Sequence, residues 1–163
     1  ALNEDWKTRG ARQREQVEVL KKVWCDDLVT YQGRFHHFTE VNITPRPVQR
    51  PIPIWFGGSS DAVVKRAAQI GDGGMPIMTP DHEAEAKLEQ LQNHLSDCGR
   101  DASAFGIEGW LRMDKADPDE WGAAAEGWRK LGAGIVMLYP MYRIPDLDDQ
   151  IETLRRFKEV VTG

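Results

Sequence analysis

The sequence predicts an α/β fold in which helices cover a parallel β-sheet. Over residues 53–161, four short apolar runs alternate with four amphipathic segments of helical periodicity. Runs that are apolar along their whole length are typical of strands with both faces covered, as in parallel sheets. The chain has 163 residues, 40% of them hydrophobic and 29% charged, which is the composition of a folded domain. Four such units fit an open doubly wound sheet or half of an α/β barrel, because a complete barrel needs about eight.

Residues 1–50 predict a helix, a hairpin and a connector ahead of the repeating units. Apolar residues at helical spacing indicate a helix over residues 12–24. Residues 28–45 are rich in β-branched and aromatic side chains and are interrupted by Gly33, which favours a hairpin or two short strands. Prolines between residues 45 and 53 then indicate an extended connector, because proline cannot donate to a central strand.

The first two βα units are predicted over residues 51–97. Ile54–Phe56 forms a short strand, followed by a helix from Ser60 to Ile70, and Gly73–Ile77 forms the second strand. Thr79 is the expected N-cap of the next helix, with proline at its first position. The apolar face of that helix is Ala84, Leu88, Leu91 and Leu95.

The last two units are predicted from residue 105 onwards. Phe105–Leu111 and Ala133–Leu138 form the third and fourth strands. Asp117 starts a helix whose third position is Glu120, and a final helix covers residues 146–161. The apolar faces of these two helices are Trp121, Ala124, Trp128 and Leu131, and Leu147, Ile151, Leu154 and Phe157. We therefore expect a single partial domain over 1–163, in which 1–50 precede four βα units in 51–163.

Charge and cysteine usage exclude several classes of function. The net charge is −5 and the basic residues are scattered, which argues against nucleic acid and anionic membranes as partners. No apolar run approaches the roughly 20 residues of a membrane-spanning helix. Cys25 and Cys98 lie far apart and are expected to be reduced thiols of a cytoplasmic protein. The chain begins at Ala1 without methionine, so we expect it to be part of a longer protein.

A Gly-Gly-Ser-Ser turn connects the first predicted strand to its helix and is the strongest candidate binding site. Gly57, Gly58, Ser59 and Ser60 place backbone N–H groups and hydroxyls at a helix N-terminus, where the helix dipole favours an anion. A phosphate suits such a turn. Taken alone, the residues of the turn favour an ordinary βα connection hydrated by water.

Other candidate positions carry weaker signals. His36 and His37 are adjacent on a predicted strand and point to opposite faces, so no metal site is expected there. Gly71-Asp72-Gly73 is expected to be a structural turn that ends a helix. Residues near strand carboxyl ends are candidates for a cofactor or substrate mouth, foremost Met78, Tyr139, Tyr142 and Arg143.

An ordered series of motifs resembles the luciferase-like monooxygenase family, above all its deazaflavin-dependent members. The series comprises YQGRFHHF from Tyr31, PRPVQRPIPIWFGGSS from Pro45 and RAAQIGDGGMP from Arg66. It covers nearly the whole chain, and its order is more specific than any one motif. One departure is Gly74, where the family usually has tryptophan.

The resemblance implies that the four strands correspond to strands five to eight of a (β/α)8 TIM-type barrel. It also implies that a cofactor phosphate binds around the turn from Gly57 to Ser60. The expected cofactor is coenzyme F420, with FMN as the alternative, and the expected activity is hydride transfer or monooxygenation of a small organic substrate. The cofactor carries that chemistry, so no catalytic residue is expected in this chain.

Two functions therefore stay open. The first is the cofactor-phosphate-binding half of such an oxidoreductase, expected to form a homodimer. The second is a non-catalytic half-barrel that associates with its own copy, because four parallel strands leave two unpaired edges.

Overall fold

The computed structural model describes residues 4–112, 117–139, 144 and 146–162. The chain forms two compact units, Ala1–Ile54 and Trp55–Gly163. The boundary lies in the proline-containing connector, where residues 42–54 form no helix or strand. None of the described helices is both long and apolar enough to cross a membrane.

The first unit contains the expected helix and hairpin. A short 3₁₀ turn, η1 (Trp6–Thr8), leads into α1 (Arg9–Cys25), which ends at Asp26. Strands β1 (Val29–Gln32) and β2 (His37–Val41) pair antiparallel, which confirms the predicted hairpin.

One carboxylate of α1 holds the turn of this hairpin. Glu15 accepts hydrogen bonds from the backbone N–H groups of Arg34, Phe35 and His36 at 2.7–2.9 Å. The Nδ1 atom of His36 lies 2.9 Å from the same carboxylate. Gly33 fits beside it because a Cβ there would lie 2.6 Å from both the Glu15 carboxyl group and the Tyr31 ring. His36 therefore belongs to hairpin packing, through its contact with a carboxylate of α1, whereas His37 begins β2 and is exposed.

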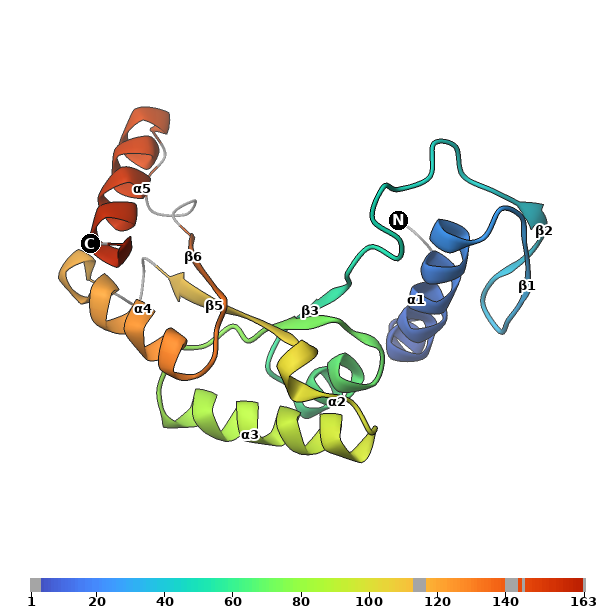
Figure 1. Cartoon of the computed structure of the whole chain (residues 1–163), viewed down its shortest axis with the longest axis horizontal. Coiled ribbons are helices and arrows are strands. Elements are labelled where there is room, and N and C mark those ends of the chain that lie inside the picture. Colours follow the sequence, from blue (N-terminus) through green and yellow to red (C-terminus); the bar gives the residue numbers. More distant parts are fainter. Residues whose placement is uncertain (1–3, 113–116, 140–143, 145, 163) are drawn as a thin grey trace. The chain divides into compact units, whose positions relative to one another are not determined.

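The second unit is a four-stranded parallel sheet with helices packed on it (Figure 1). Its strands run in the order β3-β4-β5-β6, and every neighbouring pair is parallel, as predicted. The strands are β3 (Trp55–Gly57), β4 (Gly73–Met75), β5 (Gly106–Arg112) and β6 (Ile135–Tyr139). The helices are α2 (Asp61–Ile70), α3 (His82–Asp97), α4 (Trp121–Lys130) and α5 (Leu147–Thr162), with 3₁₀ turns η2 (Ala102–Ala104) and η3 (Pro118–Glu120).

The described strands form an open sheet whose edges are β3 and β6. The α/β class and the parallel sheet are confirmed, whereas no closed barrel is present in the described part of the chain. The core lies between the sheet and its helices. All four apolar residues predicted for α3 are buried, and so are Trp121 and Trp128 of α4.

Glycines let aromatic rings lie flat on the strands. A Cβ on Gly109 would lie 2.3 Å from the Trp128 ring, so α4 covers this face of β5. On β4 and β5, Cβ atoms at Gly73 and Gly106 would each lie 2.3 Å from the ring of Trp55. The Trp55 indole therefore spans the start of both strands.

Three local expectations differ from the structure. The N-cap of α3 is Asp81, whose carboxylate accepts from the N–H groups of Glu83 and Ala84; Thr79 instead donates its hydroxyl to Asp81. A carboxylate serves two N–H donors at once, which favours aspartate. In α4 the buried alanine is Ala125, while Ala124 is half-buried, because Ala125 lies one turn from both buried tryptophans.

The predicted apolar face of α5 is the third difference. Only Phe157 is buried, whereas Leu147, Ile151 and Leu154 are exposed by 67%, 38% and 44%. The helix is amphipathic, as its periodicity predicts, but among the described residues only the part of its apolar face around Phe157 is covered by other side chains.

Candidate functional site

The turn after β3 has the geometry of a tight strand-to-helix connection. Gly58 adopts a φ of 116°, a conformation that side chains strongly disfavour. Its N–H donates to the carbonyl of Met75 at 3.1 Å and so extends the pairing with β4. Of the four predicted contact residues, Gly58 therefore has its amide already in use.

The serines of the turn hold unused donors. Ser60 is the N-cap of α2, and its carbonyl accepts from Val63 and Val64, but its hydroxyl makes no capping bond. The hydroxyl oxygen of Ser59 is buried and has no hydrogen-bond partner among the described residues. A buried unsatisfied hydroxyl costs about 1–3 kcal/mol, and the first N–H groups of a helix have no acceptor within it. These groups are suited to an added acceptor such as a phosphate oxygen.

An ion pair sits beside this helix start. Asp61 is the first residue of α2, and Lys87 of α3 donates to it at 2.7 Å and to Gln90 at 2.9 Å. A hydrogen bond from Lys87, a hydrogen bond from Gln90 and the charge of Lys87 lower the pKa of Asp61 below its ordinary value. The positive charge of Lys87 thus offsets the negative charge of Asp61, which would otherwise repel an anion at this turn.

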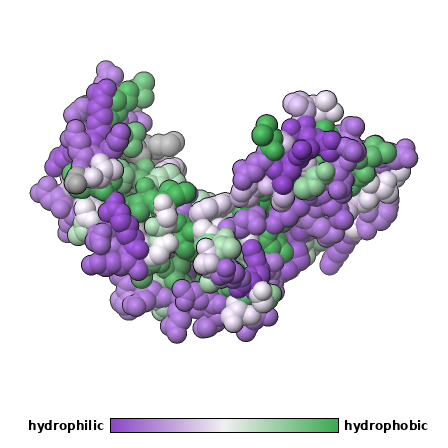
Figure 2. Space-filling view, in the orientation of Figure 1, coloured by the Kyte–Doolittle hydropathy of each residue, from purple (hydrophilic) through white to green (hydrophobic). Residues whose placement is uncertain are grey.

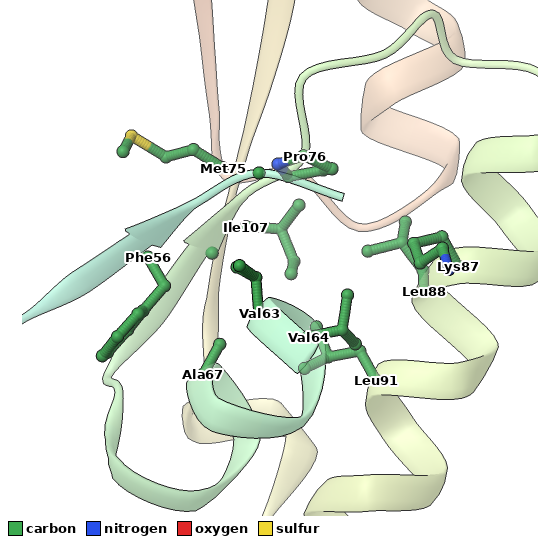
Figure 3. A pocket seen from close by; sticks show the side chains of 12 residues that line it. Phe56, Val63, Val64, Ala67, Met75, Pro76, Lys87, Leu88, Leu91 and Ile107 are labelled. Atoms are coloured by element: carbon green, nitrogen blue, oxygen red, sulfur yellow. The ribbon is translucent and has the colours of Figure 1, made fainter. Parts of the chain in front are cut away.

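A small apolar cavity lies directly behind the turn (Figure 3). It has a volume of about 20 Å³, room for little more than one water molecule. Figure 3 shows side chains of α2 and α3 converging on it, with the Lys87 stem beside Leu88. Gly74 also lines it, at the position where the sequence departs from the family pattern. The glycine leaves space here, but too little for an organic ligand.

A much larger cleft opens at the carboxyl ends of β4 and β5. We name it the β4–β5 cleft; its volume is about 570 Å³, within the roughly 300–1,000 Å³ of ligand sites. Its lining residues are Ile77, Met78, Thr79, Pro80, Glu83, Trp110, Leu111, Glu120, Ala123 and Ala124. In parallel α/β folds, ligands bind at the carboxyl ends of strands. The position and size of the cleft match that rule.

Two carboxylates border the β4–β5 cleft. Glu83 lies in the first turn of α3, and Glu120 lies in η3, just before α4. Glu120 also accepts from the N–H of Asp117, which completes a capping box and fixes the orientation of its side chain. The sequence identified Glu120 only as a capping residue and did not single out Glu83. Their shared place, one loop beyond the end of neighbouring strands, is the signal that would have found them.

The sheet face opposite α4 carries a fixed aromatic pair. Trp110 stacks on Tyr139 with ring centroids 5.4 Å apart, and its indole N–H donates to Glu108 at 2.9 Å. Figure 2 shows apolar side chains gathered over β5 and β6. Ile135 and Met137 of β6 align with Glu108 and Trp110 and so share this face. The Trp110 indole is therefore held in one position on this face.

Two of the four residues predicted for a cofactor or substrate mouth can be placed. Met78 lines the β4–β5 cleft, and Tyr139 ends β6 against Trp110. Tyr142 and Arg143 lie outside the described residues. Within the described ranges, no group of three or more histidine, cysteine, aspartate or glutamate side chains is arranged to hold a metal ion.

These features define a class: a parallel α/β protein with an anion-compatible turn and a ligand-sized cleft at the carboxyl ends of its strands. A family model for luciferase-like monooxygenases matches residues 1–140. The chain belongs to the luciferase-like monooxygenase family.

Relatives within this similarity use either of two cofactors. An F420-dependent glucose-6-phosphate dehydrogenase of Segniliparus rotundus is 32% identical over 122 residues, covering 72% of this chain and 35% of that protein. An FMNH₂-dependent dimethylsulfone monooxygenase of Pseudomonas putida is 36% identical over 76 residues, covering 44% of this chain and 21% of that protein. An uncharacterised protein of Mycobacterium bovis is 39% identical over 162 residues, covering 94% of this chain and 52% of that protein. The chain thus spans at most about half the length of these relatives.

Solved structures share the fold. The monooxygenase RslO1 of Streptomyces bottropensis superposes with a TM-score of 0.75 at 20% identity, covering 97% of this chain and 62% of that one. The coenzyme F420 dependent tetrahydromethanopterin reductase of Methanopyrus kandleri gives a TM-score of 0.70 at 16% identity, covering 89% and 61%. The α/β fold is therefore that of luciferase-like proteins.

Proposed function

We propose that this chain is the cofactor-phosphate-binding half of a luciferase-like oxidoreductase, equivalent to strands five to eight of its (β/α)8 barrel. Two observations on length and topology support this assignment. The sheet has four parallel strands in sequence order, and the chain covers 61–62% of two larger proteins of similar fold. A barrel needs about eight strands, so four further βα units would complete it.

The unused donors at the turn after β3 carry the proposal for phosphate binding. The Ser59 hydroxyl has no hydrogen-bond partner among the residues that the structure describes, and the first N–H groups of α2 form the positive end of the helix dipole. Rotation about one side-chain bond redirects a serine hydroxyl between staggered positions. A phosphate at this turn would accept from Ser59 and from the α2 start, with Ser60 adding its own free hydroxyl.

Coenzyme F420 is the proposed cofactor and FMN is the alternative. Relatives that use each of them match this chain with similar identity, 32% and 36%. When bound, the cofactor supplies hydride or oxygen chemistry for a small organic substrate. The residues of this chain bind and orient it, and none of them is proposed to react.

A titration of the chain with FMN and with F420, followed by cofactor fluorescence, tests this proposal. Ser59→Ala removes one donor to a charged group and is expected to weaken binding about ten-fold. Ser96→Ala is the matched control, because Ser96 is exposed near the end of α3, away from the turn. Equal affinity of the two variants, or the absence of binding of either cofactor, would contradict phosphate binding at this turn.

A second function is favoured by the open sheet. The β3 and β6 edges are unpaired among the described residues, and α5 exposes an apolar stripe. Open edges and apolar stripes promote association. The chain would then be a non-catalytic half-barrel that associates with its own copy, to rebuild eight strands or through another surface. A homodimer is proposed under either function.

A further inference from the structure

We propose that the β4–β5 cleft selects an organic cation with an apolar group over an anionic substrate. This inference rests on the proposed oxidoreductase function, because it names the substrate class of that enzyme. Charge, fixed geometry and apolar lining each contribute to it.

The charge of the cleft is one-sided. Glu83 and Glu120 approach it from two different elements, α3 and η3, and none of the described lining residues is lysine or arginine. Nearby acids add to this field, since Asp81 and Asp117 cap the same two helix starts. Among the described lining side chains an anionic ligand would meet no cationic group, whereas a cation would meet two carboxylates.

The carboxylates of Glu83 and Glu120 differ in how they are held, and both have oxygen atoms that can still accept a hydrogen bond from a ligand. Glu120 uses Oε2 for the N–H of Asp117 at 3.3 Å, and its position is thereby set. Glu83 makes no ion pair within the described part of the chain, and its backbone N–H donates to the Asp81 cap at 2.9 Å. A cation between them would be paired without first breaking an existing ion pair.

The remaining wall of the cleft is apolar and rigid. Leu111 is buried to 2% exposure, and Met78, Pro80 and Trp110 are half-buried. The hydrogen bond to Glu108 and the stacking on Tyr139 fix the Trp110 side chain. An apolar group packs against such a wall. A quaternary or protonated amine with an aromatic or aliphatic group matches both parts of the lining.

This preference would separate the chain from some of its relatives. Several of them are named for glucose 6-phosphate, a dianionic sugar. The charged side chains in the described lining of this cleft are carboxylates, whereas a phosphorylated substrate would require cationic side chains. The negative field thus serves to reject the wrong substrate as well as to bind the right one.

Three ligands that share a benzyl group and differ in charge test the proposal in titrations of the full chain without cofactor: benzyltrimethylammonium, benzyl alcohol and benzylphosphonate. The cation is expected to bind most tightly, and its advantage over the alcohol should shrink as salt screens the carboxylates. The double variant Glu83→Gln, Glu120→Gln should weaken binding of the cation about five-fold and leave that of the alcohol unchanged. Glutamine at 120 preserves the capping box, so the fold is kept.

Glu89→Gln is the matched control, because Glu89 is an exposed glutamate of α3 that does not line the cleft. Binding of the phosphonate as tight as that of the cation, no detectable binding of the cation, or an unchanged cation affinity in the double variant would each overturn the inference. Since no cofactor is present, these results are independent of the Ser59 titration. Loss of cofactor binding would refute the proposed function while leaving the charge preference measurable.

Discussion

Adjacent glycines in β4 face opposite sides of the sheet and meet very different neighbours. A Cβ on Gly73 would lie 2.3 Å from the Trp55 ring, while a Cβ on Gly74 would come no nearer than 3.4 Å, to the ring of Phe105. Gly73 is thus required by the indole that crosses it. Gly74 borders the small cavity behind the phosphate-compatible turn and has room for a methyl group.

The two glycines are expected to respond oppositely to alanine. Gly74→Ala should raise the free energy of unfolding by about 0.5–1 kcal/mol, because alanine restricts the unfolded chain at no steric cost. Gly73→Ala should lower it by about 1–3 kcal/mol, because the Trp55 ring must move. Chemical denaturation of both variants checks this. A loss of stability in Gly74→Ala equal to that in Gly73→Ala would show that the space beside Gly74 is not free.

At the scale of elements, Glu15 joins α1 to the β1–β2 hairpin. Burial raises the pKa of its carboxyl group, but hydrogen bonds from the His36 side chain and from the N–H groups of Phe35, Arg34 and His36 outweigh burial and lower it to about 2. The ordinary value is 4.5. A carboxylate whose pKa is lowered in the folded state stabilises that state above the ordinary pKa.

The hairpin anchor should therefore weaken as the pH falls from about 4.5 to about 2. Hydrogen exchange at the amides of Arg34, Phe35 and His36 measures this. Their protection factors, taken relative to the intrinsic exchange rate at the same pH, should fall across that interval. Glu15→Gln should show fast exchange already at neutral pH and little further change on acidification. Glu18→Gln is the control, because Glu18 accepts from the Tyr31 hydroxyl at 3.1 Å, while the three turn amides donate to Glu15. Acid-independent protection in the unmodified chain would contradict the role of Glu15.

Element type and order could be predicted from the sequence, because they depend on local spacing. The four buried residues of α3, the hairpin around Gly33 and the parallel order of the strands all follow from periodicity and turn residues. Helix starts were less certain: Asp81 and Thr79 are both capping residues, and only the geometry showed that the Asp81 carboxylate reaches two N–H groups.

The candidate site could be predicted only in part, for a physical reason. The turn from Gly57 to Ser60 is contiguous in the sequence, so its residues alone can predict it. The β4–β5 cleft is built from segments that the fold brings together, and neither Glu83 nor Glu120 is unusual in its own helix. The two glutamates line one cleft because the fold brings two helix starts together, and local sequence carries no sign of that.

At the scale of the whole molecule, α5 and the two sheet edges present surfaces that the described residues leave uncovered. Leu147, Ile151 and Leu154 are exposed on α5, and exposed apolar side chains gain about 1.5–3 kcal/mol each when fully buried. Periodicity predicts that such a face exists but cannot specify its partner. In the absence of another chain, the most concentrated apolar partner available is a second copy of the same unit.

Light scattering after size exclusion is therefore expected to give a mass of about twice 18.5 kDa at high protein concentration. Leu154→Lys should weaken this association about ten-fold, because it sets a charge within the α5 stripe. Val48→Lys is the control: Val48 is fully exposed in the first unit and should leave the mass unchanged. A dimer that tolerates Leu154→Lys would assign association to the strand edges instead. A monomer of 18.5 kDa at every concentration would refute self-association and remove the support for the non-catalytic function.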